Sequence, residues 1–172
     1  MNILMVLLAL LLPPIEDGSP LLVQNSMLLV ESRTRSSVSH VGIIINIDGE
    51  PWLYEAVQPS VRKVKLKDKL DEIKELNKKR RPNRQITAWV AKPKERLTKE
   101  QLDLGVAYLE SQVGRGYSIL GYTSGRPTQR GIHCAEMTSN FYNKMGLNFS
   151  DNPCVETPGN IWGRFEGKEE LK

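Results

Sequence analysis

The sequence predicts a single α+β domain over residues 19–172, with an antiparallel sheet packed against a helix that begins near a cysteine. Strand-like segments come mainly before helix-like segments, which is typical of α+β proteins. In His40–Ile47, branched apolar side chains alternate onto one face, and Asp48-Gly49 then predicts a tight turn. Later in the chain, apolar side chains recur at helical spacing behind Cys134.

Composition and cysteine spacing argue against nucleic-acid binding and against a metal site. The 172 residues suit one domain of ordinary size, and a net charge of +4 is too small to indicate nucleic-acid binding. The basic residues gather in Arg62–Arg84, which we interpret as a solvated helix face; the alternative is a surface that binds nucleic acid or another anionic surface. Cys134 and Cys154 belong to no CxxC motif or Cys/His cluster, so we expect no metal site and no cofactor. A disulfide between them would compete with any catalytic use of Cys134.

The chain begins with an apolar run, Ile3–Leu12, followed by Pro13-Pro14. This run is too short to span a membrane and has the length of a signal-peptide core. Gly18-Ser19 is a plausible cleavage point, although no Lys or Arg precedes the run. Residues 1–18 are therefore predicted to be a signal peptide or N-terminal anchor, with export to the periplasm or cell envelope.

Strands are predicted on both sides of the Asp48-Gly49 turn. His40–Ile47 places Val41, Ile43, Ile45 and Ile47 on one face, as a half-buried strand requires, and Pro51–Val57 returns beside it. Three further strands are expected, at Leu21–Val30, Val61–Leu66 and Gln85–Ala91. We expect a loop over Glu31–Ser39.

Three helices are predicted from periodicity and end signals. The first, Lys67–Lys79, would turn Leu70, Ile73 and Leu76 inward. The second opens with a capping box at Thr98-Lys99-Glu100-Gln101 and carries an apolar stripe of Leu102, Val106, Leu109 and Val113. The third runs from about Ile132 to Gly146, with a stripe of Cys134, Met137, Phe141 and Met145. Gly114–Gly131 and the tail after Gly146 are expected to be irregular.

Cys134 is the candidate nucleophile. A thiol in a first helical turn faces unpaired N–H groups and the positive end of the helix dipole, and both favour the thiolate. The alternative is a buried cysteine that acts as a small hydrophobic residue.

His40 is the candidate base, because His133 is adjacent to Cys134 and neighbouring helical residues diverge by about 100°. A two-residue turn at Asp48-Gly49 would pair Gly42 with Glu55, which puts His40 and Glu55 on the same face in diagonal positions. Gly42 has no side chain to separate them. The alternative is that His40 and Glu55 are polar residues on the surface of a strand.

The same residues carry a resemblance to a known family. The chain contains, in order, Ser39-His40-Val41-Gly42-Ile43, Tyr54-Glu55-Ala56, Gly116-Tyr117 and His133-Cys134-Ala135-Glu136-Met137. Over roughly Leu21 to Trp162 it resembles the circularly permuted papain-like amidases of the YiiX/YaeF type, in the NlpC superfamily of cysteine hydrolases. The resemblance implies a permuted papain-like fold in which the histidine strand precedes the cysteine helix.

The resemblance also implies roles for four residues. Cys134 would be the nucleophile, His40 the base and Glu55 the third member of a triad. Tyr117 would line the substrate-binding site or help to stabilise the oxyanion. The chain departs from the family pattern at Asn25-Ser26, where Gly-Asp is usual, and at Ala135, where serine is usual. These departures affect the entry turn and a hydroxyl near the nucleophile, but not the triad.

We therefore expect a cysteine hydrolase that cleaves amide bonds through a thioacyl-enzyme, with cell-wall peptides as one suitable substrate. One alternative is a lipid or ester acyl hydrolase or acyltransferase on the same fold, as in the related lecithin:retinol acyltransferase group. Another is a non-catalytic binding module. The expected partners are a peptide, cell-wall or acyl substrate, together with a membrane or envelope surface, and not nucleic acid.

Overall fold

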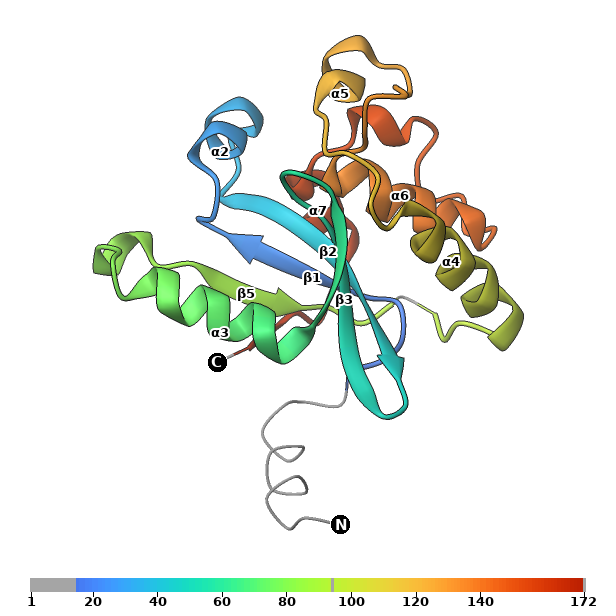
Figure 1. Cartoon of the computed structure of the whole chain (residues 1–172), viewed down its shortest axis with the longest axis horizontal. Helices are drawn as coiled ribbons and strands as arrows, with labels where there is room; N and C mark the ends of the chain where they lie inside the picture. Colours follow the sequence, from blue (N-terminus) through green and yellow to red (C-terminus); the bar gives the residue numbers. More distant parts are fainter. Residues whose placement is uncertain (1–14, 94, 172) are drawn as a thin grey trace.

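The computed structural model of the protein describes residues 15–93 and 95–171 (Figure 1). Its strands form a six-stranded antiparallel sheet with the order β4-β3-β2-β1-β5-β6. The strands are β1 Ser19–Gln24, β2 Val38–Ile47, β3 Glu50–Ala56, β4 Val61–Lys65, β5 Thr87–Val90 and β6 Glu169–Leu171. The α-helices are α2 Leu28–Thr34, α3 Leu66–Asn77, α4 Lys99–Gln112, α5 Leu120–Ser124, α6 Cys134–Lys144 and α7 Pro158–Arg164. Two 3-10 turns are η1 Pro82–Arg84 and η2 Pro153–Val155.

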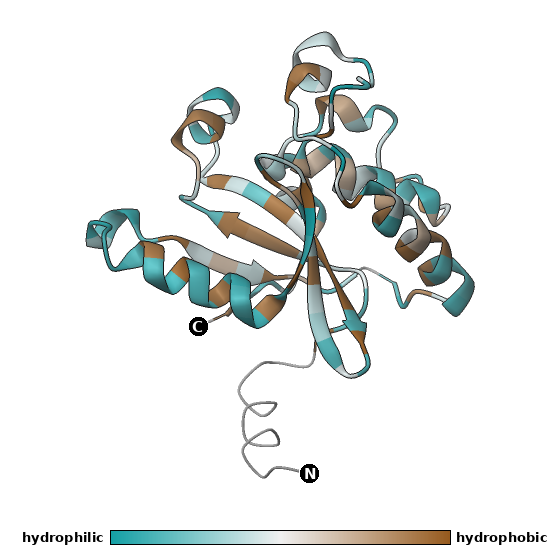
Figure 2. Ribbon diagram, viewed as in Figure 1, coloured by the Kyte–Doolittle hydropathy of each residue, from teal (hydrophilic) through white to brown (hydrophobic). Residues whose placement is uncertain are grey.

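Helices cover both faces of the sheet. Helices α6 and α7 pack against β2, with α4 beside α6, whereas α3 packs against β3 and β4. Ile43 belongs to the apolar core beneath α6, and its neighbour Ile44 belongs to the core beneath α3. Because successive side chains of a strand point to opposite faces, β2 is buried on both sides and is not the half-buried strand predicted. Figure 2 shows apolar strands at the centre and a polar outer face on α3.

The β2–β3 hairpin has the predicted register. Ile47 pairs with Glu50, and Gly42 pairs with Glu55. The two turn residues, Asp48 and Gly49, have φ angles of 53° and 80°. Positive φ at both positions is what a type I′ turn requires, and this turn matches the twist of the two strands. The Asp48-Gly49 turn therefore determines which residues of β2 and β3 lie opposite each other.

The predicted helices form, with differences near their C-terminal ends. Thr98 caps α4 through the expected reciprocal bonds with Gln101. Leu76 in α3 is 46% exposed, because repeated steps of three residues carry it about 120° around the helix from Leu70. Val113 is also exposed, because α4 ends one residue before it.

The stripe behind Cys134 is confirmed. Met137, Phe141 and Met145 are all buried against the sheet or its neighbouring helices. The helix begins at Cys134 itself and not at Ile132.

The prediction of a strand over Leu21–Val30 is only half right. Strand β1 ends at Gln24, and Asn25 takes a left-handed conformation with φ 58°. The segment that follows was predicted to be strand as far as Val30 and loop beyond it, but it forms helix α2. A short apolar run cannot be assigned to strand or helix by periodicity alone.

Two segments that were predicted to be irregular contain helices. Helix α5 interrupts the loop before Cys134, and α7 and β6 lie in the tail. The sequence carries a start signal for α7, since Thr157 accepts a bond from the N–H of Asn160 and Pro158 follows it. The nearby Pro153 and Gly159 had pointed to a loop. Strand β6 depends on pairing with β5, a contact between distant segments.

The predicted signal peptide or anchor falls mainly on residues outside the described part, and it stays a prediction. Within residues 15–93 and 95–171, no helix is both long enough and apolar enough to cross a membrane.

Candidate active site

His40 and Glu55 form a buried pair between neighbouring strands. The Nε2 atom of His40 lies 2.6 Å from Oε2 of Glu55, and the residues are 5% and 0% exposed. The β1–β2 register shifts beside His40, since Val23 pairs with His40 but Gln24 pairs with Val38. Such irregularities often redirect a side chain near a functional site. The structure therefore excludes the interpretation of His40 and Glu55 as surface residues.

Two further cations hold Glu55. Nε of Arg62 donates to Oε1 at 2.8 Å, and Nζ of Lys69 lies 3.3 Å from Oε2. Burial alone would raise the pKa of Glu55, but His40, Lys69 and Arg62 together hold that pKa well below its ordinary value. Glu55 is therefore a carboxylate at neutral pH, despite its complete burial.

Sequence reasoning missed both Arg62 and Lys69, although each had a signal. Arg62 pairs directly with Glu55 in the β3–β4 register, and both strands were predicted. Lys69 stands on the inner stripe of α3 with Leu66, Leu70 and Ile73, at the spacing of core residues. The interpretation of Arg62–Arg84 as a solvated face is therefore wrong for Lys69, which is only 8% exposed.

Cys134 is the first residue of α6 and is 4% exposed. Burial would raise the pKa of its thiol, but the nearby imidazoles of His133 and His40 outweigh burial and lower the pKa to about 6. The N-terminal end of the helix acts in the same direction. Burial lowers the pKa of His40, while its bonds with Cys134 and Glu55 raise it to about 9. These directions favour a thiolate beside an imidazolium.

His133 is the N-cap of α6 and lies outside the helix, with an extended backbone. Its Nε2 bonds the carbonyl oxygen of Cys154 at 2.8 Å, and its Nδ1 accepts from the N–H of Glu136 at 3.3 Å. Both ring nitrogens thus have backbone partners. His40 is the imidazole better suited to exchange a proton with Cys134, for this reason and not because of the helical angle used in the sequence analysis.

Tyr117 lies beside the cysteine helix. Its N–H donates to the carbonyl of Pro59 at 2.9 Å, and it forms an isolated parallel bridge with Ile132. Burial, followed by the negative charge of Cys134, raises the pKa of its phenol, which keeps Tyr117 protonated. The structure thus brings all four residues of interest, Cys134, His40, Glu55 and Tyr117, into one region.

A cavity of about 500 Å³ opens onto Cys134. Tyr117 and His133 line it beside the thiol, and most of the remaining wall comes from α2, from α5 and from the segment before α7. The apolar members of this wall include Met27, Leu29, Val30, Ile119, Leu120 and Pro158. A substrate that reaches Cys134 through this cavity therefore passes a largely apolar surface.

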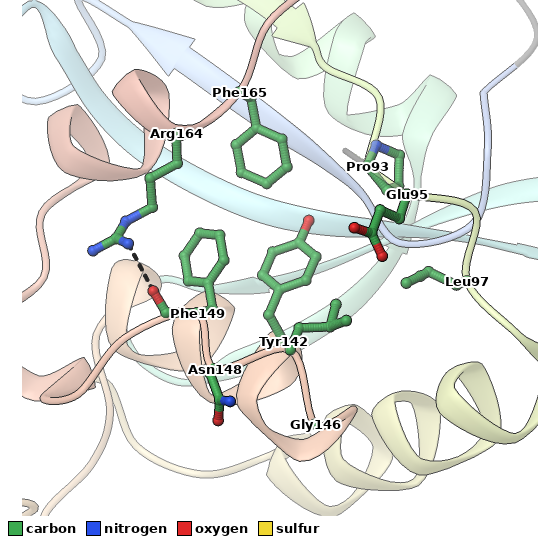
Figure 3. A pocket seen from close by; sticks show the side chains of 10 residues that line it. Pro93, Glu95, Leu97, Tyr142, Gly146, Asn148, Phe149, Arg164 and Phe165 are labelled. Carbon is green, nitrogen blue, oxygen red and sulfur yellow. Dashed lines mark hydrogen bonds between the residues drawn. The ribbon is translucent and has the colours of Figure 1, made fainter.

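A second cavity of about 420 Å³ lies elsewhere, beside the end of α6 (Figure 3). Tyr142, Phe149 and Phe165 form its aromatic wall, and Arg164 donates to the carbonyl of Phe149 at 2.7 Å. Its lining contains neither Cys134 nor His40. The chemistry therefore belongs to the first cavity.

Within residues 15–93 and 95–171, no group of three His, Cys, Asp or Glu side chains is arranged to hold a metal ion. His40 and Glu55 bond each other. Cys134 and Cys154 are both free thiols, so no disulfide competes for Cys134 in this structure.

Together, the sheet order, the cysteine helix and the strand-borne histidine define an α+β fold. The solved structure of yiiX from Escherichia coli O157:H7, described as a metalloprotein of DUF1105, is similar with a TM-score of 0.66. The similarity covers 92% of this chain and 97% of that chain at 14% sequence identity. No protein-family profile and no curated protein matches the sequence. At this identity the similarity shows the fold, which agrees with the predicted resemblance.

Proposed function

We propose that the protein is a cysteine hydrolase that forms a thioacyl-enzyme on Cys134. The observation that carries the proposal is the buried contact of 2.6 Å between Nε2 of His40 and Oε2 of Glu55. Cys134 begins α6, and His133 and His40 lower the pKa of its thiol. A nucleophile, a base and an orienting carboxylate in contact are the requirements of covalent acyl transfer.

In the proposed reaction, Sγ of Cys134 attacks the carbonyl carbon of an amide or ester. His40 holds the proton that came from the thiol and gives it to the leaving amine or alcohol as the carbon–nitrogen or carbon–oxygen bond breaks. Water then attacks the thioester, His40 takes a proton from that water, and the carboxylic acid leaves. Cys134 recovers its proton, so the net reaction adds one water across the bond.

Glu55 would orient the imidazole and stabilise its charged form. Arg62 and Lys69 are positioning residues in this scheme, because they bond Glu55 and not the reacting atoms. Their charges keep Glu55 ionised, which in turn favours a protonated His40. Arg62 and Lys69 therefore favour, through Glu55, the thiolate–imidazolium form needed for attack.

The developing oxyanion would lie at the N-terminal end of α6, where N–H groups of the first helical turn have no helical acceptor. Tyr117 lines the same cavity. We assign it to substrate contact, with its protonated phenol able to donate to the oxyanion.

The same catalytic residues would serve an amine or an alcohol as the leaving group. Amide cleavage, with cell-wall peptides as one substrate, is the reading that the sequence resemblance favours. An ester acyl hydrolase or acyltransferase would use the same residues. A binding module would need neither a lowered thiol pKa nor the buried ion pair.

The test is to trap the acyl-enzyme by mass spectrometry. Muropeptides, N-acyl amides and p-nitrophenyl esters are each incubated with the protein, with Cys134→Ala as the blank and Cys154→Ser as the matched thiol control. We expect an acyl mass on the peptide that contains Cys134, in the parent and in Cys154→Ser. Absence of an acyl mass with every substrate class would contradict the proposal.

A further inference from the structure

The exposed apolar side chains of the described residues are not scattered. Most of them stand on α2, on α5 and its preceding residues, or on η2. They are Met27, Leu28, Leu29, Ile119, Leu120, Tyr122 and Val155, and we call this set the apolar rim. The other large exposed ones, Leu76, Leu104 and Val113, lie on or at the end of α3 and α4.

Helix α2 displays its apolar residues to solvent instead of burying them. It contains no buried residue, and Leu28 and Leu29 are 70% and 60% exposed. The helix is attached at its base, where the hydroxyl of Ser39 accepts from the N–H groups of Ser26 and Met27. In Figures 1 and 2, α2 and α5 project from the same end of the domain, and both carry apolar residues. Contiguous exposed apolar surface of this kind marks an interaction site.

The rim is also basic. Arg33 and Arg35 follow the leucines of α2, and Arg126 and Arg130 follow α5; all four are exposed. None has an ion-pair partner in the part of the chain that the structure describes. The acidic residue of α2, Glu31, is bonded to Arg84 at 2.7 Å and does not neutralise these arginines. Apolar and cationic side chains together suit an anionic membrane surface.

The rim is continuous with the candidate active site. Met27 and Leu29 from α2, and Ile119, Leu120 and Tyr122 from the opposite side, also line the cavity that opens onto Cys134. The apolar rim and the entrance to Cys134 therefore share residues.

We propose that the apolar rim docks on an anionic lipid bilayer, and that the cavity between α2 and α5 takes the acyl chain of an amphiphile from that bilayer. The chain would lie along the apolar wall with its carbonyl at Cys134. Docking on the bilayer is inferred from the apolar rim alone. Attack of Cys134 on the acyl carbonyl rests on the proposed function.

Docking is tested by co-sedimentation of the full chain with vesicles of phosphatidylcholine, with and without phosphatidylglycerol. Leu29→Asp is compared with Leu104→Asp, because the two leucines are 60% and 59% exposed and the charge change is the same. We expect Leu29→Asp to lose most binding and Leu104→Asp to keep it. The N-terminal apolar run is common to both variants, so it cannot produce the difference. Equal binding by both would overturn the docking surface.

The charge contribution is tested with a double reversal at the rim, Arg33→Glu with Arg126→Glu. Its control is Arg96→Glu with Lys144→Glu, two exposed cations just before α4 and at the C-terminal end of α6, with the same total charge change. We expect only the rim variant to lose the preference for phosphatidylglycerol. Loss of that preference in both variants would show a net-charge effect and contradict the assigned surface.

The acyl-chain site is tested by the rate at which p-nitrophenyl acetate, butyrate and octanoate acylate Cys134. Each methylene that enters an apolar cavity is worth about threefold to fourfold in binding, so we expect octanoate to exceed acetate by at least about tenfold. Equal rates would remove the acyl-chain site and leave the proposed function intact. Acylation by none of the esters, with rim-dependent vesicle binding, would contradict the acyl-chain site and leave the docking surface.

Discussion

His40 and Glu55 are separated by fifteen positions in the chain, yet their side chains meet at 2.6 Å in a buried pair. The contact follows from one hairpin, in which Gly42 pairs directly with Glu55. His40 lies two residues before Gly42, on the diagonal that long side chains can bridge. The two-residue turn at Asp48-Gly49 thus brings the imidazole and the carboxylate together.

Replacement of Glu55 by Gln should lower the rate of hydrolysis by about two to four orders of magnitude, because the amide cannot stabilise an imidazolium. Glu50→Gln, an exposed change on the same strand, is the control and should retain the rate. Rates are measured at a temperature where thermal unfolding shows both variants folded. An unchanged rate in Glu55→Gln would mean that the pair is structural only.

Replacement of Gly42 by Ala should force the hairpin apart. An added Cβ would lie 2.7 Å from the carbonyl oxygen of Tyr54 and 3.2 Å from Cβ of Glu55. We expect a loss of about 1–3 kcal/mol in the free energy of unfolding, together with reduced activity. Gly163→Ala in α7 meets nothing within 4 Å and should not destabilise the protein. Equal stability of the two variants in denaturant unfolding would contradict this account.

Alkylation should distinguish the two thiols by pH. The pKa of Cys134 is lowered to about 6, whereas burial, with Glu136 nearby, raises the pKa of Cys154 to about 11. The rate at Cys134 should therefore climb through pH 6 and level off by pH 8, while Cys154 stays slow. Peptide mapping after iodoacetamide treatment gives both rates, and Cys154→Ser should leave the Cys134 profile unchanged. Matching profiles at the two sites would show that Cys134 is not activated.

Replacement of Lys69 by Met should make the protein more sensitive to acid. Because the folded state lowers the pKa of Glu55 through His40, Lys69 and Arg62, this carboxylate contributes stability above its unfolded pKa. That stability is lost as pH falls through the folded pKa. Without Lys69 the folded pKa of Glu55 rises, so the carboxylate contributes less stability and that contribution is fully lost at a higher pH.

The measurement for Lys69→Met is the midpoint of acid unfolding followed by circular dichroism. Lys67→Met is the matched control, since Lys67 is exposed in the same helix and its bridge to Asp71 spans 3.4 Å. An exposed pair of this kind contributes only about 0–1 kcal/mol. A shift of the midpoint by the same amount in both variants would argue against a special role for Lys69.

Local chemistry explains which parts of the site could be predicted. The turn residues Asp48 and Gly49 specify the register, and the register specifies the partnership of His40 with Glu55. Cys134 could be assigned because Met137 and Phe141 mark the buried side of its helix. Each of these inferences depends on residues close together in the chain.

What could not be predicted depends on contacts between distant segments or on exposure. Lys69 reads as one more cation in a basic run until α3 is seen packed against β3 and β4. Helix α2 reads as strand because an apolar run is normally buried, and here Leu28 and Leu29 face solvent. Strand β6 exists only through its pairing with β5.

The short β2–β3 hairpin determines the order in which parts of the candidate site form during synthesis. The hairpin lies early in the chain and closes over a two-residue turn, so its entropic cost of closure is small. Cys134 leaves the ribosome much later, and its helix needs β2 already in place to pack against. A growing chain therefore holds the imidazole and carboxylate before it holds the thiol. The thiol meets its activating partner only once α6 docks, so reactivity should arise together with the completed fold and not during synthesis.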